Sequence, residues 1–203
     1  MIAVVDYGLG NRTSVVGALY RLGYESVVSA DPVVLADAEK LILPGVGAFG
    51  DGMRNLKERN LVGPLTELVI GGGKPLLGIC LGFQLIAASS NEFGDHAGLG
   101  WIDAQVVRLA PEASELRIPH VGWNELRQLR PSILFEDIPD DALFYYVHSY
   151  RIEGADEYVI GECEYGASFP AVIAKDNVYA TQFHPEKSQR HGLKLLENFL
   201  LQA

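Results

Sequence analysis

The chain has 203 residues, of which 48% are hydrophobic and 21% are charged. These proportions are close to globular averages and exclude a disordered chain, a collagen-like chain and a coiled-coil fibre. With 26 acidic residues against 16 Lys and Arg, the net charge is −10, which argues against nucleic acid as a general partner because phosphate binding needs a dense basic surface.

The N-terminal segment predicts a strand, a glycine-rich turn and a helix. Residues 2–5 are apolar and predict a buried strand, and the turn covers 6–11. The helix has an apolar stripe formed by Val15, Ala18, Leu19 and Leu22. Asn11 is its expected N-cap and Gly23 its expected end.

Two further strands are expected in this half, at 41–43 and 75–79, and each leads into glycines. Two helical stretches, divided near Gly63 and Pro64, are predicted between these strands, and 84–90 is expected to be helical. Strands that alternate with helices in this way predict a parallel sheet with helices on both faces.

The second half of the chain has a different pattern, with strand-like segments joined by turns. They lie near 101–109, 142–147, 157–164, 171–175 and 178–183. Part of the sheet should therefore be antiparallel or mixed. A final helix is predicted from the apolar stripe Leu193, Leu196, Phe199 and Leu200, with Ser188 as its cap. Because there is no repeat, low-complexity tract or linker, we expect a single domain over residues 1–203.

The sequence also bears on the cellular compartment. The longest nearly apolar stretch, 75–88, is too short and too polar to span a bilayer. The N-terminus has neither the basic region nor the cleavage site of a signal peptide. Two cysteines do not make a disulfide scaffold. We therefore expect no membrane association and a reducing compartment, the cytoplasm.

Cys80 provides the strongest local signal for chemistry. It lies between a predicted strand and a helical pattern, and Gly78 and Gly82 allow a tight turn around it. This is the pattern of a nucleophile elbow with cysteine in place of serine. A helix N-terminus favours the thiolate, which is the reactive form. The alternative is a small buried core residue, the usual role of a free cysteine.

A nucleophilic cysteine needs a base and a group that orients the base. His184 follows a strand-like segment and precedes Pro185, which favours extended backbone at His184. Residues two apart in an extended segment project to the same side, so Glu186 is placed to hold the imidazole. The pattern predicts a triad of Cys80, His184 and Glu186.

Acyl transfer also needs an oxyanion hole. The loop 44–47, with the sequence Pro-Gly-Val-Gly, should open at the same sheet edge as Cys80 because both follow predicted strands. A backbone N–H of this loop and the N–H of Leu81 are the expected donors. The loop by itself is equally compatible with a plain connection between a strand and a helix.

Other patterns are weaker. Gly8 and Gly10 suggest a nucleotide site but lack the full dinucleotide fingerprint. His184, His191 and a carboxylate would be needed for zinc, yet no Cys or His pair has the spacing of metal ligands, so no metal is expected. Cys163 is interpreted as structural because its two neighbouring carboxylates oppose a thiolate.

Taken together, the segments 44–47, 78–84 and 182–186 resemble the class I, triad-type glutamine amidotransferases. Within that class the chain is similar to the glutaminase subunits of imidazole glycerol phosphate synthase, an enzyme of histidine biosynthesis. The segments that carry this likeness are 6–11, 44–53, 119–124, 146–150 and 184–188. Phe83 stands where the family often has methionine, a departure that affects only packing.

The resemblance implies a three-layer α/β fold, whose central sheet is mostly parallel or mixed, with helices on both faces and some antiparallel strands. It implies that Cys80 attacks the side-chain amide of glutamine. His184 would protonate the leaving ammonia and then activate water against the glutamyl thioester, while Glu186 orients His184. The implied oxyanion hole consists of the backbone of Val46, Gly47 and Leu81. No cofactor is implied.

The resemblance further implies a glutamine pocket lined by Gly47, Gln84, Glu92, His148, Ser149 and Tyr150. The implied partner is a (β/α)₈-barrel cyclase subunit, bound as a heterodimer. It would receive the ammonia and convert a phosphoribulosyl-formimino nucleotide into imidazole glycerol phosphate and aminoimidazole carboxamide ribotide. The residues implied to face it are Asn11, Arg12, Trp123, Asn124 and Lys187. By residue type alone, Trp123 also suits an ordinary core position.

Three other functions fit part of the pattern. One is the glutaminase subunit of anthranilate or aminodeoxychorismate synthase, against which the segments 6–11 and 122–124 argue. Another is a regulatory binding module, in which a glutamine-like electrophile would leave Cys80 unlabelled. The third is a γ-glutamyl hydrolase that works alone, which would be fully active without a partner.

Overall fold

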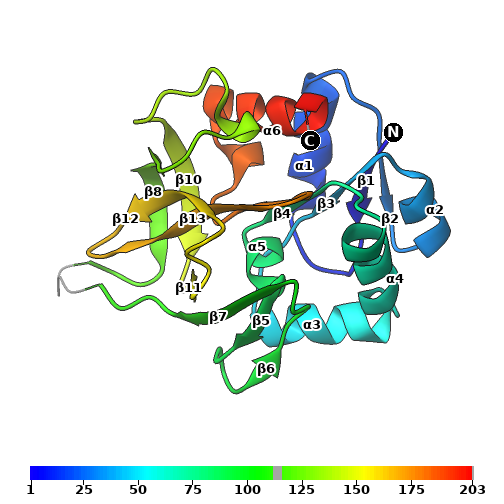
Figure 1. The fold of residues 1–203 in the computed structure, drawn as a ribbon, viewed down its shortest axis with the longest axis horizontal. Helices are drawn as coiled ribbons and strands as arrows, with labels where there is room; N and C mark the ends of the chain where they lie inside the picture. The colour runs from blue at the N-terminus through cyan, green and yellow to red at the C-terminus, as the bar shows by residue number, and fades with distance from the viewer. Residues whose placement is uncertain (112–115, 203) are drawn as a thin grey trace.

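An eight-stranded mixed sheet crosses the centre of the computed structural model, which describes residues 1–111 and 116–202 (Figure 1). The strand order is β2-β1-β3-β4-β14-β13-β12-β9. Neighbouring strands are parallel from β2 to β14 and antiparallel from β14 to β9. The strands are β1 (Ile2–Val5), β2 (Ser26–Ser29), β3 (Lys40–Leu43), β4 (Leu76–Ile79), β9 (Arg127–Gln128), β12 (Val159–Glu164), β13 (Ser168–Lys175) and β14 (Val178–Thr181).

Helices cover both faces of this sheet (Figure 1). The first face carries α1 (Arg12–Arg21) and α6 (Gln189–Gln202). The second carries α2 (Pro32–Asp37), α3 (Phe49–Glu58), α4 (Val62–Thr66) with its π-helical continuation η1 (Glu67–Gly71), and α5 (Leu81–Leu85). Alternation along β1 serves both layers, since Ile2 and Val4 pack with the first set and Ala3 and Val5 with the second.

Two smaller sheets complete the fold. One pairs β8 (His120–Glu125) with β10 (Leu143–His148) in antiparallel fashion. The other has the order β11-β7-β5-β6, formed by β11 (Tyr150–Glu153), β7 (Ile102–Arg108), β5 (Ala87–Ser90) and β6 (His96–Ala97). Two 3₁₀ helices, η2 (Ile133–Phe135) and η3 (Pro185–Lys187), lie in connections. Within the described ranges, none of the helices combines the length and apolar character needed to cross a membrane.

The predicted fold class is confirmed, and so are most of the predicted strands. Asn11 caps α1 as expected, because its side-chain oxygen accepts the Ser14 N–H at 3.3 Å. Gly23 follows the end of that helix with a φ of +83°, a left-handed conformation that glycine adopts without strain. Sequence reasoning did not identify β2, α2, β8 or β11.

The predicted division of the helices near Gly63 and Pro64 is wrong. The break falls earlier, where α3 ends at Glu58 and Asn60 has a φ of +56°. Gly63 and Pro64 both lie in the first turn of α4. Proline is tolerated in a first turn because the N–H groups there have no partner within the helix.

The helix predicted over 84–90 is wrong in its second half. Helix α5 begins directly after Cys80 and ends at Leu85, and Ala87–Ser90 form β5. This run of small residues has no periodicity of its own, and its pairing with β7 and β6 determines the strand.

Ser188 stands directly before α6, but its hydroxyl does not cap the helix as predicted. The hydroxyl donates to the carbonyl oxygen of His184 at 2.6 Å and accepts the N–H of Tyr145 at 2.9 Å. Ser188 therefore joins the β10 strand to the segment that carries His184.

Candidate active site

The backbone of Cys80 forms a sharp turn between β4 and α5. Its φ of +53° and ψ of −102° are unusual for a residue with a side chain. The Cys80 N–H donates to the carbonyl oxygen of Thr181 at 2.8 Å, which fixes the turn to the end of β14. A Cβ at Gly82 would overlap the carbonyl oxygen of Leu43, so only glycine lets α5 leave the turn this close to β3. A strained turn held from both sides is the geometry of a nucleophile elbow.

His184 follows β14 in extended backbone, with φ −101° and ψ +93°, as the proline after it predicts. Its Nδ1 lies 2.8 Å from Oε1 of Glu186, and both side chains are only 1% exposed. The predicted pairing of His184 with Glu186 thus exists, but only His184 has the extended backbone from which it was predicted. Glu186 lies in the 3₁₀ turn η3 and not in an extended segment.

The two nitrogens of His184 have different surroundings. Nδ1 pairs with Glu186, while Nε2 is buried without a hydrogen-bond partner at ordinary distance among the described residues. Burial lowers the pKa of His184, but the nearby Cys80 sulfur and the hydrogen-bonded Glu186 carboxylate outweigh this effect and raise the pKa to about 10. Because Nδ1 is held by Glu186, Nε2 is the nitrogen of His184 that is available to exchange a proton.

Gln182 is a polar neighbour of Cys80 that sequence reasoning did not single out. Its side chain is fully buried, and its Nε2 donates to the Cys80 Sγ at 3.9 Å. Its Oε1 accepts a hydrogen bond from Nε2 of Gln84 at 3.1 Å. The available signal was a glutamine two residues before His184, where the alternation of an extended segment places both side chains on one side.

The predicted oxyanion loop packs against the start of α5. The carbonyl oxygen of Gly45 accepts the N–H of Leu81 at 3.4 Å, so this expected donor is occupied. Gly47 has a φ of +122°, and a Cβ there would meet only Leu9 at 3.8 Å. The hydroxyl of Tyr7, which is fully buried, donates to the carbonyl oxygen of Pro44 at 2.7 Å and anchors the start of the loop.

Of the predicted glutamine-binding residues, Gln84 and Tyr150 are in direct contact. The Nε2 of Gln84 donates to the carbonyl oxygen of Tyr150 at 3.1 Å. Ser149 connects β10 to β11 immediately before Tyr150. The ring of His148 is buried, and both of its nitrogens have protein partners: the Tyr150 carbonyl oxygen and His120. Its side chain therefore offers no free donor.

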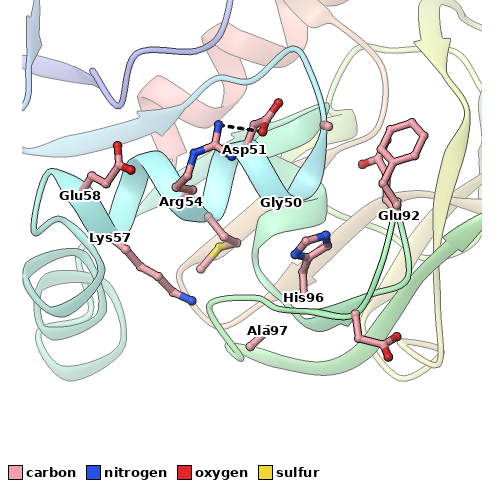
Figure 2. A pocket seen from close by; sticks show the side chains of 12 residues that line it. Gly50, Asp51, Arg54, Lys57, Glu58, Glu92, His96 and Ala97 are labelled. Carbon is pink, nitrogen blue, oxygen red and sulfur yellow. Dashed lines mark ion pairs between the residues drawn. The ribbon is translucent and has the colours of Figure 1, made fainter.

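Glu92 borders a separate cavity of about 570 Å³ beside α3 (Figure 2). Its Oε2 accepts the N–H of Phe49 at 2.7 Å, and burial raises the pKa of Glu92. Figure 2 shows Arg54 and Lys57 on the helix side of the cavity and His96 opposite. Of the predicted glutamine-binding residues, only Glu92 is among the described residues that line this cavity, and Cys80 is not among them.

The predicted partner-facing residues fall into two groups. Asn11 and Arg12 stand at the start of α1, where Arg12 is ion-paired with Asp6. Trp123 is 45% exposed, so the alternative of a core position is wrong. The rings of Trp123 and Tyr145 lie 6.0 Å apart, and Nζ of Lys187 lies 5.8 Å from the Tyr145 ring. We call Trp123, Tyr145 and Lys187 the aromatic surface cluster.

Comparisons with known proteins show which family the chain belongs to. The family model for glutamine amidotransferase class-I matches residues 3–203. The imidazole glycerol phosphate synthase subunit HisH of Geobacter sulfurreducens is 50% identical over 204 residues, covering 98% of this chain and 97% of the relative. The HisH subunit of Desulfitobacterium hafniense is 48% identical over 200 residues, covering 98% and 93%.

Solved structures with low sequence identity share the fold. PurLQS from Thermotoga maritima superimposes with a TM-score of 0.75 at 19% identity and covers 98% of this chain and 96% of the other. The glutaminase domain of Trypanosoma brucei CTPS, solved with bound acivicin, gives a TM-score of 0.68 at 14% identity and covers 98% and 93%.

Proposed function

Because this chain belongs to the class-I glutamine amidotransferase family, we propose that it is the glutaminase subunit of an imidazole glycerol phosphate synthase, with Cys80, His184 and Glu186 as its catalytic triad. The relatives at 48–50% identity over nearly the full chain support the enzyme assignment. The observation that carries the residue assignment is the strained turn at Cys80 beside a histidine whose Nδ1 is held by Glu186 at 2.8 Å.

The chemistry follows from this geometry. The Cys80 thiolate attacks the side-chain amide carbon of glutamine and forms a tetrahedral oxyanion. His184 gives its Nε2 proton to the leaving nitrogen, so that ammonia departs and a glutamyl thioester remains. His184 then takes a proton from water, which attacks the thioester, and glutamate and the Cys80 thiol are released. Glu186 keeps Nδ1 protonated and stabilises the imidazolium throughout.

The oxyanion hole needs a rearrangement before it can work. The N–H of Leu81 must exchange its bond to the Gly45 carbonyl oxygen for a bond to the substrate oxyanion. Rotation of the peptide between Gly45 and Val46 would withdraw that carbonyl and present the N–H of Val46 as a second donor. In this proposal, nucleotide binding in the partner subunit triggers the rearrangement, because it shifts the equilibrium between the two loop conformations.

The partner is a (β/α)₈-barrel cyclase subunit, and this chain docks on it through Asn11, Arg12, Asn124 and the aromatic surface cluster. An exposed Trp beside Tyr145 and Lys187 supports this assignment, because Trp and Tyr are enriched in interface cores. Ammonia passes to the cyclase, which uses it to make imidazole glycerol phosphate. The free, buried state of Cys80 and Cys163 fits a reducing compartment, the cytoplasm.

The deciding experiment measures glutamate release from glutamine by this chain alone and by the chain with the purified cyclase subunit and its nucleotide substrate. We expect strong activation only in the mixture. Equal activity in both samples would leave the Cys80 chemistry standing but remove the assignment to imidazole glycerol phosphate synthase. It would favour a hydrolase that works alone.

A second experiment tests the nucleophile. A glutamine-like electrophile should label Cys80 in the assembled complex, and Cys80→Ala should abolish the label. Cys163→Ala is the matched control and should be labelled like the wild type, because burial raises the pKa of the Cys163 thiol to about 12. An unlabelled wild-type complex would favour a regulatory binding module.

A further inference from the structure

A continuous chain of side-chain hydrogen bonds runs from the predicted partner face to the wall of the glutamine pocket. Nδ2 of Asn124 donates to the carbonyl oxygen of Glu164 at 2.8 Å and lies 3.4 Å from Nε2 of His120, so its two hydrogens can serve both partners. Nδ1 of His120 lies 3.1 Å from Nε2 of His148, and Nδ1 of His148 lies 2.8 Å from the carbonyl oxygen of Tyr150. Both histidines are buried, at 3% and 6% exposure. The mechanism described above gives neither of them a role.

The direction of every bond in this chain is determined by its two ends. A carbonyl oxygen only accepts, so Nδ1 of His148 must carry the proton. In a neutral ring Nε2 of His148 is then an acceptor, which requires Nδ1 of His120 to be the donor. Nε2 of His120 therefore accepts, and the amide nitrogen of Asn124 is its donor. The oxygen of Asn124 accepts the N–H of Glu125 at 2.9 Å, which confirms this orientation of the amide.

The surroundings keep both rings neutral and in place. Burial lowers the pKa of His120 to about 4. Burial also lowers the pKa of His148 to about 3, with His120 and His184 adding to the effect. The His120 ring stacks on Tyr165 at 4.0 Å and on Tyr146 at 4.9 Å. Neutral, stacked imidazoles make fixed links and do not act as proton donors to the solvent.

The far end of the chain reaches the reacting sulfur. The Tyr150 carbonyl oxygen accepts two hydrogen bonds, one from His148 and one from Nε2 of Gln84. Gln84 also donates to Oε1 of Gln182, and Gln182 donates to the Cys80 Sγ at 3.9 Å. A displacement of His148 therefore changes the position of a carbonyl to which the Gln84 side chain is bound.

We propose that His120 and His148 are positioning residues that transmit the docking of the partner at Asn124 to the glutamine pocket at Tyr150 and Gln84. This inference rests on the proposed function, because it assumes a partner on the Asn124 face and glutamine beside Gln84. It differs from the rearrangement of the oxyanion loop, since the two histidines approach the pocket from β8 and β10 and do not involve residues 44–47.

The functional test compares His120→Phe with the wild type, alone and in the complex with the cyclase subunit and nucleotide. Phenylalanine retains a ring between Tyr146 and Tyr165 but removes both nitrogens. We expect activation by the partner to fall by about fivefold or more, the lower end of usual allosteric couplings, with the loss expressed in KM for glutamine more than in kcat. Wild-type activation and KM in this variant would overturn the proposal.

A matched control is His191→Phe, which changes a histidine near Phe144 that lies outside the chain of hydrogen bonds and should retain wild-type activation. The wild-type complex separates the two claims. If it shows no activation, the proposed function fails, whereas an active wild-type complex with an unaffected His120→Phe variant refutes the relay alone.

A measurement on the unaltered protein covers the case in which His120→Phe does not fold. In a ¹⁵N-histidine-labelled sample at pH 7, both rings should be neutral with Nδ1 protonated and Nε2 unprotonated. A nitrogen–nitrogen coupling across the hydrogen bond should connect Nδ1 of His120 to Nε2 of His148. Protonation at Nε2 in either ring would contradict the assigned direction and overturn the proposal.

Discussion

The N–H of Leu81 donates to the carbonyl oxygen of Gly45 at 3.4 Å. This bond occupies a donor that a working oxyanion hole would direct at the substrate. In the candidate active site, Cys80 and His184 are thus already in place, whereas the N–H group that would stabilise the substrate oxyanion is still occupied. In the proposed mechanism, turnover requires the loop that contains Gly45 to move, and this requirement makes the geometry suited to control by a partner.

Gly47→Ala tests the loop directly. The φ of +122° at Gly47 is strained for alanine, while a Cβ there would meet no close neighbour, so the variant should keep the fold but displace the loop from its present conformation. We expect kcat for glutamine hydrolysis in the complex to fall by about 10²–10³-fold, the usual cost of one oxyanion donor. Glutamate release and a thermal melt measure the two effects. Gly63→Ala is the control, because a Cβ at Gly63 would meet no atom within 4 Å. Wild-type turnover in Gly47→Ala would refute a role of the loop in forming the oxyanion hole.

Tyr7→Phe removes the hydroxyl that anchors the same loop. Because the Pro44 carbonyl oxygen would lose a buried donor, we expect the free energy of unfolding to fall by about 1–3 kcal/mol. Chemical denaturation of the purified chain measures this change. Tyr20→Phe is the matched control, since Tyr20 is 82% exposed and should show no change. Equal stability of both variants would show that the hydroxyl does not hold the loop.

Glu186→Gln should change both activity and the pH dependence of stability. Loss of the orienting carboxylate should lower kcat by about 10²–10⁴-fold, the usual contribution of a positioned acid–base group. The folded-state pKa of His184 is raised from 6.5 to about 10, so this group stabilises the protein fully below pH 6.5, and the stabilisation is lost as the pH rises toward 10. Glu186→Gln removes one of the groups that raise the pKa of His184.

The stability difference between the wild type and Glu186→Gln should therefore be larger at pH 6 than at pH 9. Denaturant unfolding at the two pH values measures it. Glu197→Gln is a suitable control, because it breaks a surface ion pair with Lys194 at 3.3 Å and should show a small difference. If the loss of stability in Glu186→Gln increased with pH, the prediction would be contradicted.

Trp123→Ala tests the partner face. As an exposed aromatic anchor, Trp123 should contribute about 2 kcal/mol or more to binding of the cyclase, with little effect on folding. Calorimetric titration of the two subunits measures the affinity. Ile70→Ala removes a side chain of similar exposure (49%) from η1 and should bind normally. Unchanged affinity in Trp123→Ala would remove it from the interface.

The candidate site was more predictable from the sequence than the smaller elements around it. The elbow at Cys80 depends on local glycines, and the cap at Asn11 depends on one side chain, so both can be inferred from short segments. The strand β5 and the break at Asn60 were mispredicted because pairing with distant strands and a single left-handed residue determine them. The hydrogen bond between His120 and His148 joins residues 28 apart, and those of Gln182 to Gln84 and Cys80 join residues 98 and 102 apart, so the sequence near each residue does not indicate its partner.

The order of the strands has a consequence for how the protein is made. Strand β4 pairs with β14, and the Cys80 N–H is bound to Thr181, so the nucleophile is completed by a segment that leaves the ribosome about a hundred residues later. Until that segment arrives, β4 has only β3 beside it, and Cys80 lacks both its bond to Thr181 and its neighbour His184. With the proposed triad, a growing chain therefore contains the cysteine for most of its synthesis without being able to hydrolyse glutamine.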